Sequence, residues 1–196
     1  TINLAWINLF SGRIQNVEDL KLFFMQQRDH LKHEFYLPTI KEYFYKTLRV
    51  LSDAVGRDIH SLDECMQLDY RELYHVATNL GIFSRALSYI SEAYYVGANT
   101  LLAFHREDVE LFKASDFNEK FKQVFQNEIK LNRIIKFPEA HNIELMKTML
   151  KYFHQNDYIE KDEGSYKIAD IEKLKDYLTN LETELREQLK FNLKAI

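Results

Sequence analysis

Only five glycines and two prolines interrupt the 196 residues of this chain. Because these two residues break helices and form tight turns most readily, their scarcity favours long helices over a sheet with many turns. Apolar residues make up 46% of the chain and charged residues 29%, which is typical of a soluble globular protein that buries one sizeable core. The sequence therefore predicts a mainly α fold, organised as a multi-helix domain.

Capping residues mark the starts of the first helices. Asn16 is placed to cap a segment with one apolar face, and Thr39 with Glu42 three residues later forms a capping box. Two further boxes have the same spacing: Ser61 with Glu64, and Asp69 with Glu72. We expect a helix from residue 16 that Pro38 stops, one from Thr39 to Gly56, a short helical turn after Ser61, and a helix that ends at Gly81.

The segment from Ser84 to His105 is strongly hydrophobic. Its length approaches the roughly 20 residues that span a bilayer, but six polar residues interrupt it, which favours a central helix buried in the core. These residues are Arg85, Ser88, Ser91, Glu92, Asn99 and Thr100. A further amphipathic helix is expected from Asp116 to Lys136, closed by Pro138, with its inward face formed by Phe117, Phe121, Val124, Phe125, Leu131 and Ile135.

The tail of the chain has a different pattern. Ile143–Gln155 is predicted to be helical, and the segments Tyr158–Glu160 and Ser165–Ile168 flank the turn Lys161–Gly164 like the strands of a small hairpin. A last helix begins at Ile171, so the order helix, hairpin, helix resembles part of a winged helix. Its apolar seam is too short for a stable coiled coil and is expected to dock on its own domain: Ile171, Leu174, Leu178, Leu181, Leu185 and Leu189.

These patterns predict two parts that pack into one structural unit. Residues 1–140 form an aromatic-rich helical domain, and residues 141–196 form a helix, hairpin and helix tail packed on it. The first eleven residues are apolar but too short to cross a bilayer, and they lack the basic flank and cleavage site of a signal peptide. We therefore expect no segment that crosses a membrane.

Charge and cysteine content exclude several classes of function. The 26 basic and 30 acidic side chains give a net charge of −4, so the chain lacks the basic surface of a general nucleic-acid binder. Cys65 is the only cysteine, which rules out an internal disulfide framework and a cysteine-based zinc site.

The sequence contains no recognised catalytic signature: no glycine-rich phosphate loop, nucleophile elbow, kinase set or His-Glu-x-x-His motif. His30 and His33 lie three residues apart, as a metal-binding pair would, but no third ligand is evident and a polar helix edge is the preferred interpretation. Four acidic residues at the hairpin lack the spacing of a calcium loop and are interpreted as a solvated turn: Asp157, Glu160, Asp162 and Glu163. We predict no catalytic residue, no cofactor and no metal site.

Two surfaces have the composition of a membrane-facing or ligand-facing region. A basic outer face on the 116–136 helix is interpreted as solvated charge, with an anionic lipid or a phosphate-bearing ligand as the alternative: Lys120, Lys122, Lys130, Arg133 and Lys136. Seven aromatic residues cluster in two neighbouring helices, where core packing accounts for at least half and the rest are candidates for a membrane interface: Phe23, Phe24, Phe35, Tyr36, Tyr43, Phe44 and Tyr45.

Three segments resemble the glycerol-3-phosphate 1-O-acyltransferase family, which also contains the dihydroxyacetone-phosphate acyltransferases. The segments are Arg28–Pro38, Tyr89–Leu102, and Arg133–Ala140 followed by Lys147–Leu150 and Asn156–Ile159. Their order and spacing agree with the region that follows the catalytic domain in that family. His33, where the family has an aromatic residue, and Ala140–Asn142, where it has small polar residues, leave the branch of the family open.

The resemblance implies that the catalytic residues lie in another part of the enzyme. The family transfers an acyl group with a His-x4-Asp pair, in which His acts as the base and Asp orients it. No Asp stands four or five residues after any of the seven histidines: His30, His33, His60, His75, His105, His141 and His154. The resemblance therefore covers the C-terminal helical region alone, and this chain is expected to be inactive by itself.

The partners that the resemblance implies are the catalytic acyltransferase domain of the same parent chain and a membrane surface. Acyl-CoA or acyl-carrier protein would act through the parent, at the cytoplasmic face of a bacterial inner membrane or at an organellar membrane, while this fragment itself is soluble. The acyl donor and the choice between glycerol 3-phosphate and dihydroxyacetone phosphate stay open.

Two alternatives belong to other classes. A stand-alone helical adaptor would bind a protein partner through its winged-helix-like tail and its leucine seam. A DNA-reading winged helix over Ile143–Leu189 is disfavoured by the acidic hairpin, because the wing normally meets phosphate.

Overall fold

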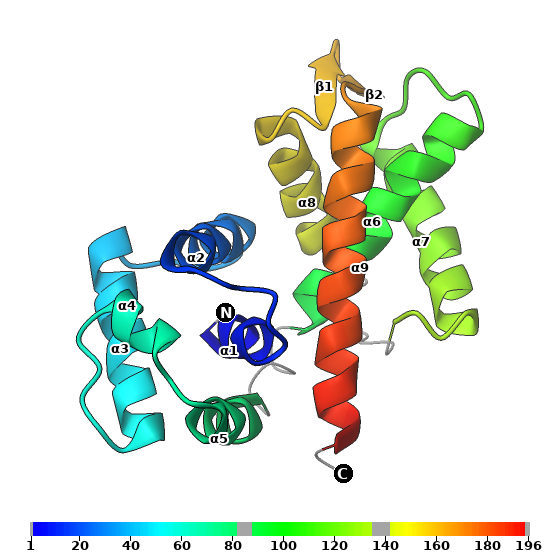
Figure 1. Cartoon of the computed structure of the whole chain (residues 1–196). Coiled ribbons are helices and arrows are strands. Elements are labelled where there is room, and N and C mark those ends of the chain that lie inside the picture. Colours follow the sequence, from blue (N-terminus) through cyan, green and yellow to red (C-terminus); the bar gives the residue numbers. More distant parts are fainter. Residues whose placement is uncertain (1, 82–87, 135–141, 195–196) are drawn as a thin grey trace. The chain divides into compact units, whose positions relative to one another are not determined.

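The computed structural model describes residues 2–81, 88–134 and 142–194 of the 196-residue chain. Within these ranges the chain forms nine helices and one two-stranded hairpin, which confirms the predicted mainly α fold with a C-terminal hairpin (Figure 1). Contacts divide the chain into two compact units, one of Thr1–Ala86 with Arg186–Ile196 and one of Leu87–Leu185. These bounds differ from the expected division at residue 140, which stays a prediction about domains.

The first unit contains five helices before residue 82: α1 (Ile2–Phe10), α2 (Val17–Leu31), α3 (Ile40–Val55), α4 (Leu62–Met66) and α5 (Tyr70–Gly81). Their caps follow the sequence signals. Asn16 accepts a bond from the Asp19 N–H at the start of α2, Thr39 and Glu42 form the expected reciprocal box, and Gly56 ends α3 in the left-handed conformation. Ser61 caps α4, and the Asp69–Glu72 pair caps α5.

The prediction that α2 continues to Pro38 is wrong. The helix ends at Leu31, whose carbonyl accepts bonds from the backbone N–H groups of both Glu34 and Phe35. The Arg28 Nη2 atom then lies 3.4 Å from the Pro38 carbonyl oxygen, which ties the following loop to the end of the helix. Because the chain leaves the helix early, Phe35 does not continue its buried face and is 40% exposed.

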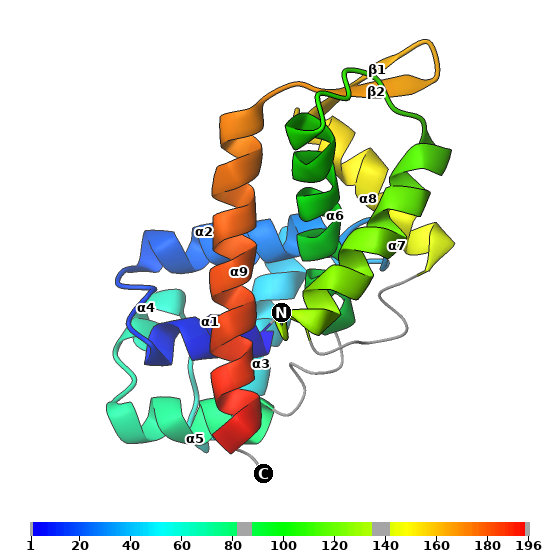
Figure 2. The ribbon, with the colours of Figure 1, turned by 90° about the vertical axis from the view of Figure 1, so that its right-hand side faces the viewer.

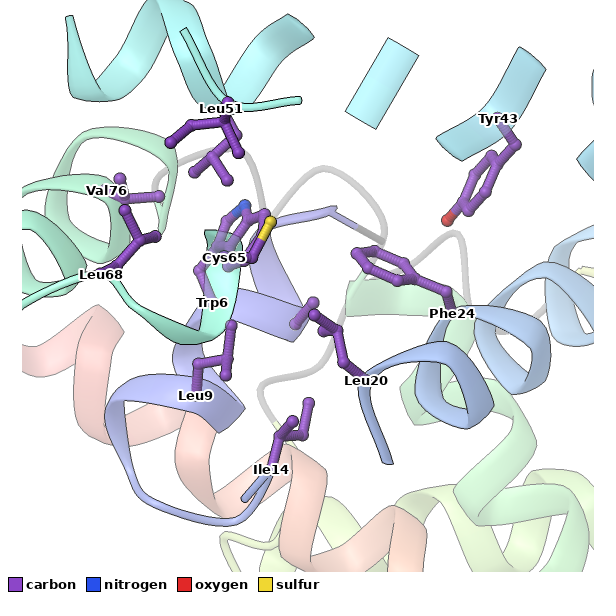
Figure 3. Packing of buried hydrophobic residues seen from close by; sticks show 12 residues of the cluster. Trp6, Leu9, Ile14, Leu20, Phe24, Tyr43, Leu51, Cys65, Leu68 and Val76 are labelled. Carbon is purple, nitrogen blue, oxygen red and sulfur yellow. The ribbon is translucent and has the colours of Figure 1, made fainter. Parts of the chain in front are cut away.

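The core of the first unit joins all five helices around Trp6 and Phe24. The Trp6 and Phe24 rings meet edge to face with centroids 6.3 Å apart, and Phe24 meets Tyr43 in the same way at 6.0 Å. Figure 3 shows how side chains from α1 to α5 gather there, including Leu51, Cys65 and Val76. Burial of these side chains stabilises the unit by about 1.5–3 kcal/mol for each large apolar residue.

The second unit contains α6 (Ser88–Arg106), α7 (Ala114–Lys130), α8 (Ile143–Gln155), β1 (Ile159–Asp162), β2 (Ser165–Ile168) and the first part of α9 (Ile171–Lys194). The strands pair from Ile159 with Ile168 to Asp162 with Ser165, and Glu163 and Gly164 both have positive φ, as a two-residue hairpin turn requires. Phe112, between α6 and α7, forms an isolated bridge to Tyr166. Figure 2 shows the segment between α6 and α7 beside the hairpin.

Helix α6 is buried on most sides, as predicted, and aromatic side chains pack around it. Gly97 lets α8 approach closely, because a Cβ atom at this position would lie only 1.9 Å from the Met149 sulfur. Rings from α6, α8, the start of the hairpin and α9 form one cluster: Tyr94, Tyr152, Phe153, Tyr158 and Tyr177. Residues 84–87 of the expected central helix lie outside the described residues.

Helix α7 ends at Lys130, six residues before the expected end at Lys136. Asn132 adopts the left-handed conformation with φ 54°, and the Arg133 N–H bonds back to the Glu128 carbonyl, which together end the helix. Leu131 is therefore exposed, and its assignment to the inward face is wrong. Ile135, Lys136 and Pro138 lie outside the described residues.

The apolar seam of α9 is buried at Leu174, Leu181 and Leu185, in agreement with the prediction that it docks rather than stays exposed. Tyr177 is also buried, although the leucine spacing did not indicate it, while Ile171 and Leu178 are only partly buried. The side chain of Leu189 is among those that the structure does not describe.

Candidate functional site

Acyl transfer to an alcohol needs a base that a carboxylate orients, so the partners of the histidine rings decide whether one of them suits this role. The His75 Nε2 atom lies 2.8 Å from the Asn79 side-chain nitrogen, and His154 Nδ1 lies 3.2 Å from the Ile159 carbonyl oxygen. Burial lowers the pKa of His30 to about 4, although the neighbouring Asp29 opposes the shift, so its ring is neutral and weakly basic at pH 7. His141 lies outside the described residues.

His30 and His33 do not share a helix face, which the alternative of a metal-binding pair required. Helix α2 ends at Leu31, so His33 lies in the turn that follows the helix rather than on the same helical face as His30. Among the residues that the structure describes, no group of three or more His, Cys, Asp or Glu side chains is arranged to hold a metal ion.

Two of the four acidic residues at the hairpin form ion pairs with lysines. The Glu160 carboxylate lies 2.8 Å from the Lys167 Nζ atom across the two strands, and Asp157 lies 4.0 Å from Lys173. Asp162 ends β1, and Glu163 is the first residue of the turn. The acidic surface is thus partly neutralised by neighbouring lysines.

The basic face expected on α7 is also divided by ion pairs. Lys120 pairs with Glu107, and the Arg133 guanidinium lies 3.7 Å from the Glu128 carboxylate. Lys122 and Lys130 are exposed, and Lys136 lies outside the described residues. The basic residues of α7 are therefore explained as ordinary surface charge, without an anionic ligand.

A buried polar group in the second unit is the feature that the sequence reasoning missed. The Tyr95 hydroxyl of α6 donates a hydrogen bond to Glu128 Oε2 of α7 at 3.0 Å, and Arg133 pairs with the same oxygen. Burial raises the pKa of Tyr95 to about 12, and the Glu128 carboxylate adds to the shift, so the hydroxyl stays protonated and donates. We call these three residues the Glu128 cluster.

A sequence signal for the Glu128 cluster exists. Glu128 follows Phe117, Phe121 and Phe125 at spacings of four, four and three, so it occupies the inward face of α7 where the pattern otherwise has aromatic residues. A carboxylate at such a position needs a partner, because burying an unpaired charge is strongly unfavourable. The cluster joins residues of the second and third family-like segments, Tyr95 and Arg133, and its chemistry is suited to holding structure rather than to proton transfer.

A second polar contact joins α6 to α9. The Ser91 hydroxyl donates to Glu184 Oε1 at 3.2 Å, and both Glu184 and the neighbouring Glu92 of α6 are buried. In the second unit, hydrogen bonds to two buried carboxylates, Glu128 and Glu184, therefore join helices in addition to the aromatic core.

The seven clustered aromatic residues divide as the sequence suggested. Phe24 and Tyr43 are buried, and Phe23 and Phe44 are partly buried against the same core. The remaining three are exposed: Phe35, Tyr36 and Tyr45. No helix among the described residues has both the length and the apolar character needed to cross a membrane.

Comparison with known families gives the identity of this region. The family model for the glycerol-3-phosphate acyltransferase C-terminal region matches residues 5–162. No curated protein and no solved structure matched the chain. The matched range contains all three segments on which the resemblance was based and extends to the end of β1. The chain therefore belongs to the family of glycerol-3-phosphate acyltransferase C-terminal regions.

Proposed function

We propose that this chain is the non-catalytic C-terminal helical domain of an enzyme that acylates position 1 of glycerol 3-phosphate. Its role is to pack against the catalytic domain of the same parent chain and to support the acyl site there. The observation that carries this proposal is the family match over residues 5–162, which is specific to the C-terminal region.

The chemistry of the reaction supports the non-catalytic part of the proposal. The glycerol hydroxyl attacks the thioester carbonyl, a base takes the hydroxyl proton, and the thiol of CoA or acyl-carrier protein leaves. Such a base is efficient when its pKa is near the working pH and when a carboxylate orients it. None of the seven histidines is followed by Asp at the family spacing, and the pKa of His30 is about 4, too low for this role.

The proposed supporting role rests on how the helices of the second unit are joined. Helices α6, α7 and α8 of the second unit are joined by the aromatic cluster and by the Glu128 cluster, which holds Arg133 at the start of the third family-like segment. A rigid scaffold of this kind positions a neighbouring domain better than a flexible one, because small misplacements of reacting groups reduce rates strongly.

The test is an acylation assay on the purified 196-residue chain with glycerol 3-phosphate and palmitoyl-CoA. We expect no 1-acylglycerol 3-phosphate above the background of heat-treated protein. Product formation that depends on the chain and is lost in a histidine variant such as His75→Ala or His154→Ala would overturn the proposal. The same assay with dihydroxyacetone phosphate covers the other acceptor of the family.

A further inference from the structure

Exposed aromatic and apolar residues gather where α2 leads into α3, at the left edge of the first unit in Figure 1. Tyr36 is fully exposed, Tyr45 is 66% exposed, and Phe35 and Ile40 are each about 40% exposed. The early end of α2 creates this arrangement, because it turns Phe35 and Tyr36 out into the loop before α3. Water-exposed rings of this size mark surfaces that are covered in the working protein.

Basic residues surround these rings. Lys41, Tyr45 and Arg49 are spaced four apart on the outer face of α3, and Lys46 is exposed beside them. Between residues 28 and 50 the chain has five basic residues (Arg28, Lys32, Lys41, Lys46, Arg49) and three acidic ones (Asp29, Glu34, Glu42), a net charge of +2 against −4 for the whole chain. We call Phe35, Tyr36, Ile40, Lys41, Tyr45, Lys46 and Arg49 the basic aromatic face.

Two acidic residues of this region, Glu42 and Asp29, have local partners. The Glu42 carboxylate accepts bonds from the Thr39 N–H and hydroxyl, contacts that lower the pKa of Glu42 and keep it charged within the cap. Asp29 lies 3.3 Å from Lys32 in an ion pair. On α3 the three exposed basic residues, Lys41, Lys46 and Arg49, outnumber the two exposed acidic ones, Glu42 and Asp53.

A second exposed aromatic group provides a contrast. Tyr70 and Tyr74 of α5 are also exposed, but both rings contact the Phe10 ring in a tilted arrangement, with centroids 5.0 and 5.9 Å away. The neighbouring charges of Arg57 and Glu72 neutralise each other in an ion pair. This group has neither the free-standing rings nor the excess of basic residues that the face on α3 has.

We propose that the basic aromatic face rests on the interface of an anionic bilayer, with Tyr36 and Phe35 at headgroup level and the basic residues of α3 on lipid phosphates. Tyrosine suits this interface because its ring is apolar and its hydroxyl is hydrated, and lysine and arginine near the surface are attracted by anionic lipids. The inference rests on the proposed function, since the acylated product of that reaction belongs in a bilayer.

The experiment uses vesicles of phosphatidylcholine alone and vesicles with about 30% phosphatidylglycerol, in a co-flotation assay with the 196-residue chain. We expect binding to the anionic vesicles, at least about tenfold weaker binding to the neutral ones, and weakening with added salt. The variants Tyr36→Asp with Phe35→Ser, and Lys41→Glu with Lys46→Glu, should each lower binding about tenfold or more. The matched control Tyr70→Asp places the same charge on the other exposed aromatic group and should bind like the wild type.

A fluorescence arm reports which residue enters the interface. Trp6 is the only tryptophan and is fully buried, so a Tyr36→Trp variant adds one exposed reporter. Its emission should shift to shorter wavelength and be quenched by brominated lipids in anionic vesicles, whereas Tyr70→Trp should show neither effect. Circular dichroism of each variant checks that the helices are retained.

Absence of vesicle binding, equal binding to both lipid mixtures, or binding that leaves the Tyr36→Trp emission unchanged would each overturn the inference. The first outcome would assign the face to a protein partner instead. Failure here is distinguishable from failure of the proposed function, because the acylation assay of the isolated chain contains no vesicles and reads a different quantity.

Discussion

At the scale of single residues, a few positions carry constraints that a pattern of apolar and polar residues does not reveal. Gly97 lies in the middle of α6, where glycine is normally unfavourable, because α8 approaches it too closely for a side chain. Glu128 lies on an otherwise apolar helix face because Tyr95 and Arg133 satisfy it. Neither position was singled out from the sequence, and only the structure identifies what each one contacts.

Substituting Gly97→Ala tests the close contact between α6 and α8. The new methyl group would overlap the Met149 side chain, so we expect a loss of about 1–3 kcal/mol in the free energy of unfolding, although alanine is the better helix former. Chemical denaturation measures the change. In the Met149→Ala background the same substitution should be harmless or stabilising, and an equal loss in both backgrounds would contradict the contact as its cause.

His30 predicts how stability depends on pH. Its pKa in the folded chain is about 4, below the ordinary value near 6.5, because burial disfavours the charged ring. As the pH falls, the unfolded chain therefore takes up a proton on His30 before the folded chain does. The favourable contribution of neutral His30 to the free energy of unfolding is complete above pH 6.5 and is lost as the pH falls from 6.5 to 4. His30→Gln should reduce that loss by about 1–2 kcal/mol, measured as the difference in unfolding free energy between pH 7 and pH 4.5.

The control for this measurement is His105→Gln, since His105 is an exposed histidine at the end of α6. This variant should follow the wild-type pH dependence. If His30→Gln and His105→Gln change the dependence equally, the burial of His30 is not its source.

At the scale of helices and strands, sequence signals located starts better than ends. The N-caps at Asn16, Thr39 and Ser61 are short-range hydrogen bonds whose residue types are visible in the sequence. Pro38 and Pro138, taken as stops, predict ends for α2 and α7 that are too late in the chain. What ends these helices is the turn around the Leu31 carbonyl and the left-handed Asn132, which propensity alone does not single out.

The capping box of α3 gives the test at this scale. Thr39→Ala removes the hydroxyl that accepts the Glu42 N–H, so the free energy of unfolding should fall by about 1 kcal/mol, while Thr39→Ser should retain the cap. Thr148→Ala is the matched control, because the Thr148 hydroxyl bonds only the Glu144 carbonyl within its own helix. A change of less than about 0.5 kcal/mol is expected there, and equal effects at both positions would contradict the cap.

At the scale of the whole molecule, the sequence indicated the fold class, the hairpin and the family, whereas the bounds of the two compact units come from the structure. Helices and hairpins depend on neighbours in sequence, whereas the division into units depends on contacts such as Trp6 with Phe24 and Ser91 with Glu184, which periodicity does not define. The exposed position of Tyr36 could not be read from the sequence either, since it follows from the early end of α2. The absence of the family's His-x4-Asp pair, in contrast, can be read from the sequence alone.

The central claim is that this chain supports acyl transfer that is carried out elsewhere in its parent enzyme. The most direct measurement compares the rate of glycerol 3-phosphate acylation by the parent's catalytic domain alone with its rate when the 196-residue chain is supplied as a separate protein. We expect the rate to rise about tenfold or more and to saturate with the concentration of the added chain. A catalytic domain that is equally fast without the chain, or acylation by the chain in its absence, would contradict the account.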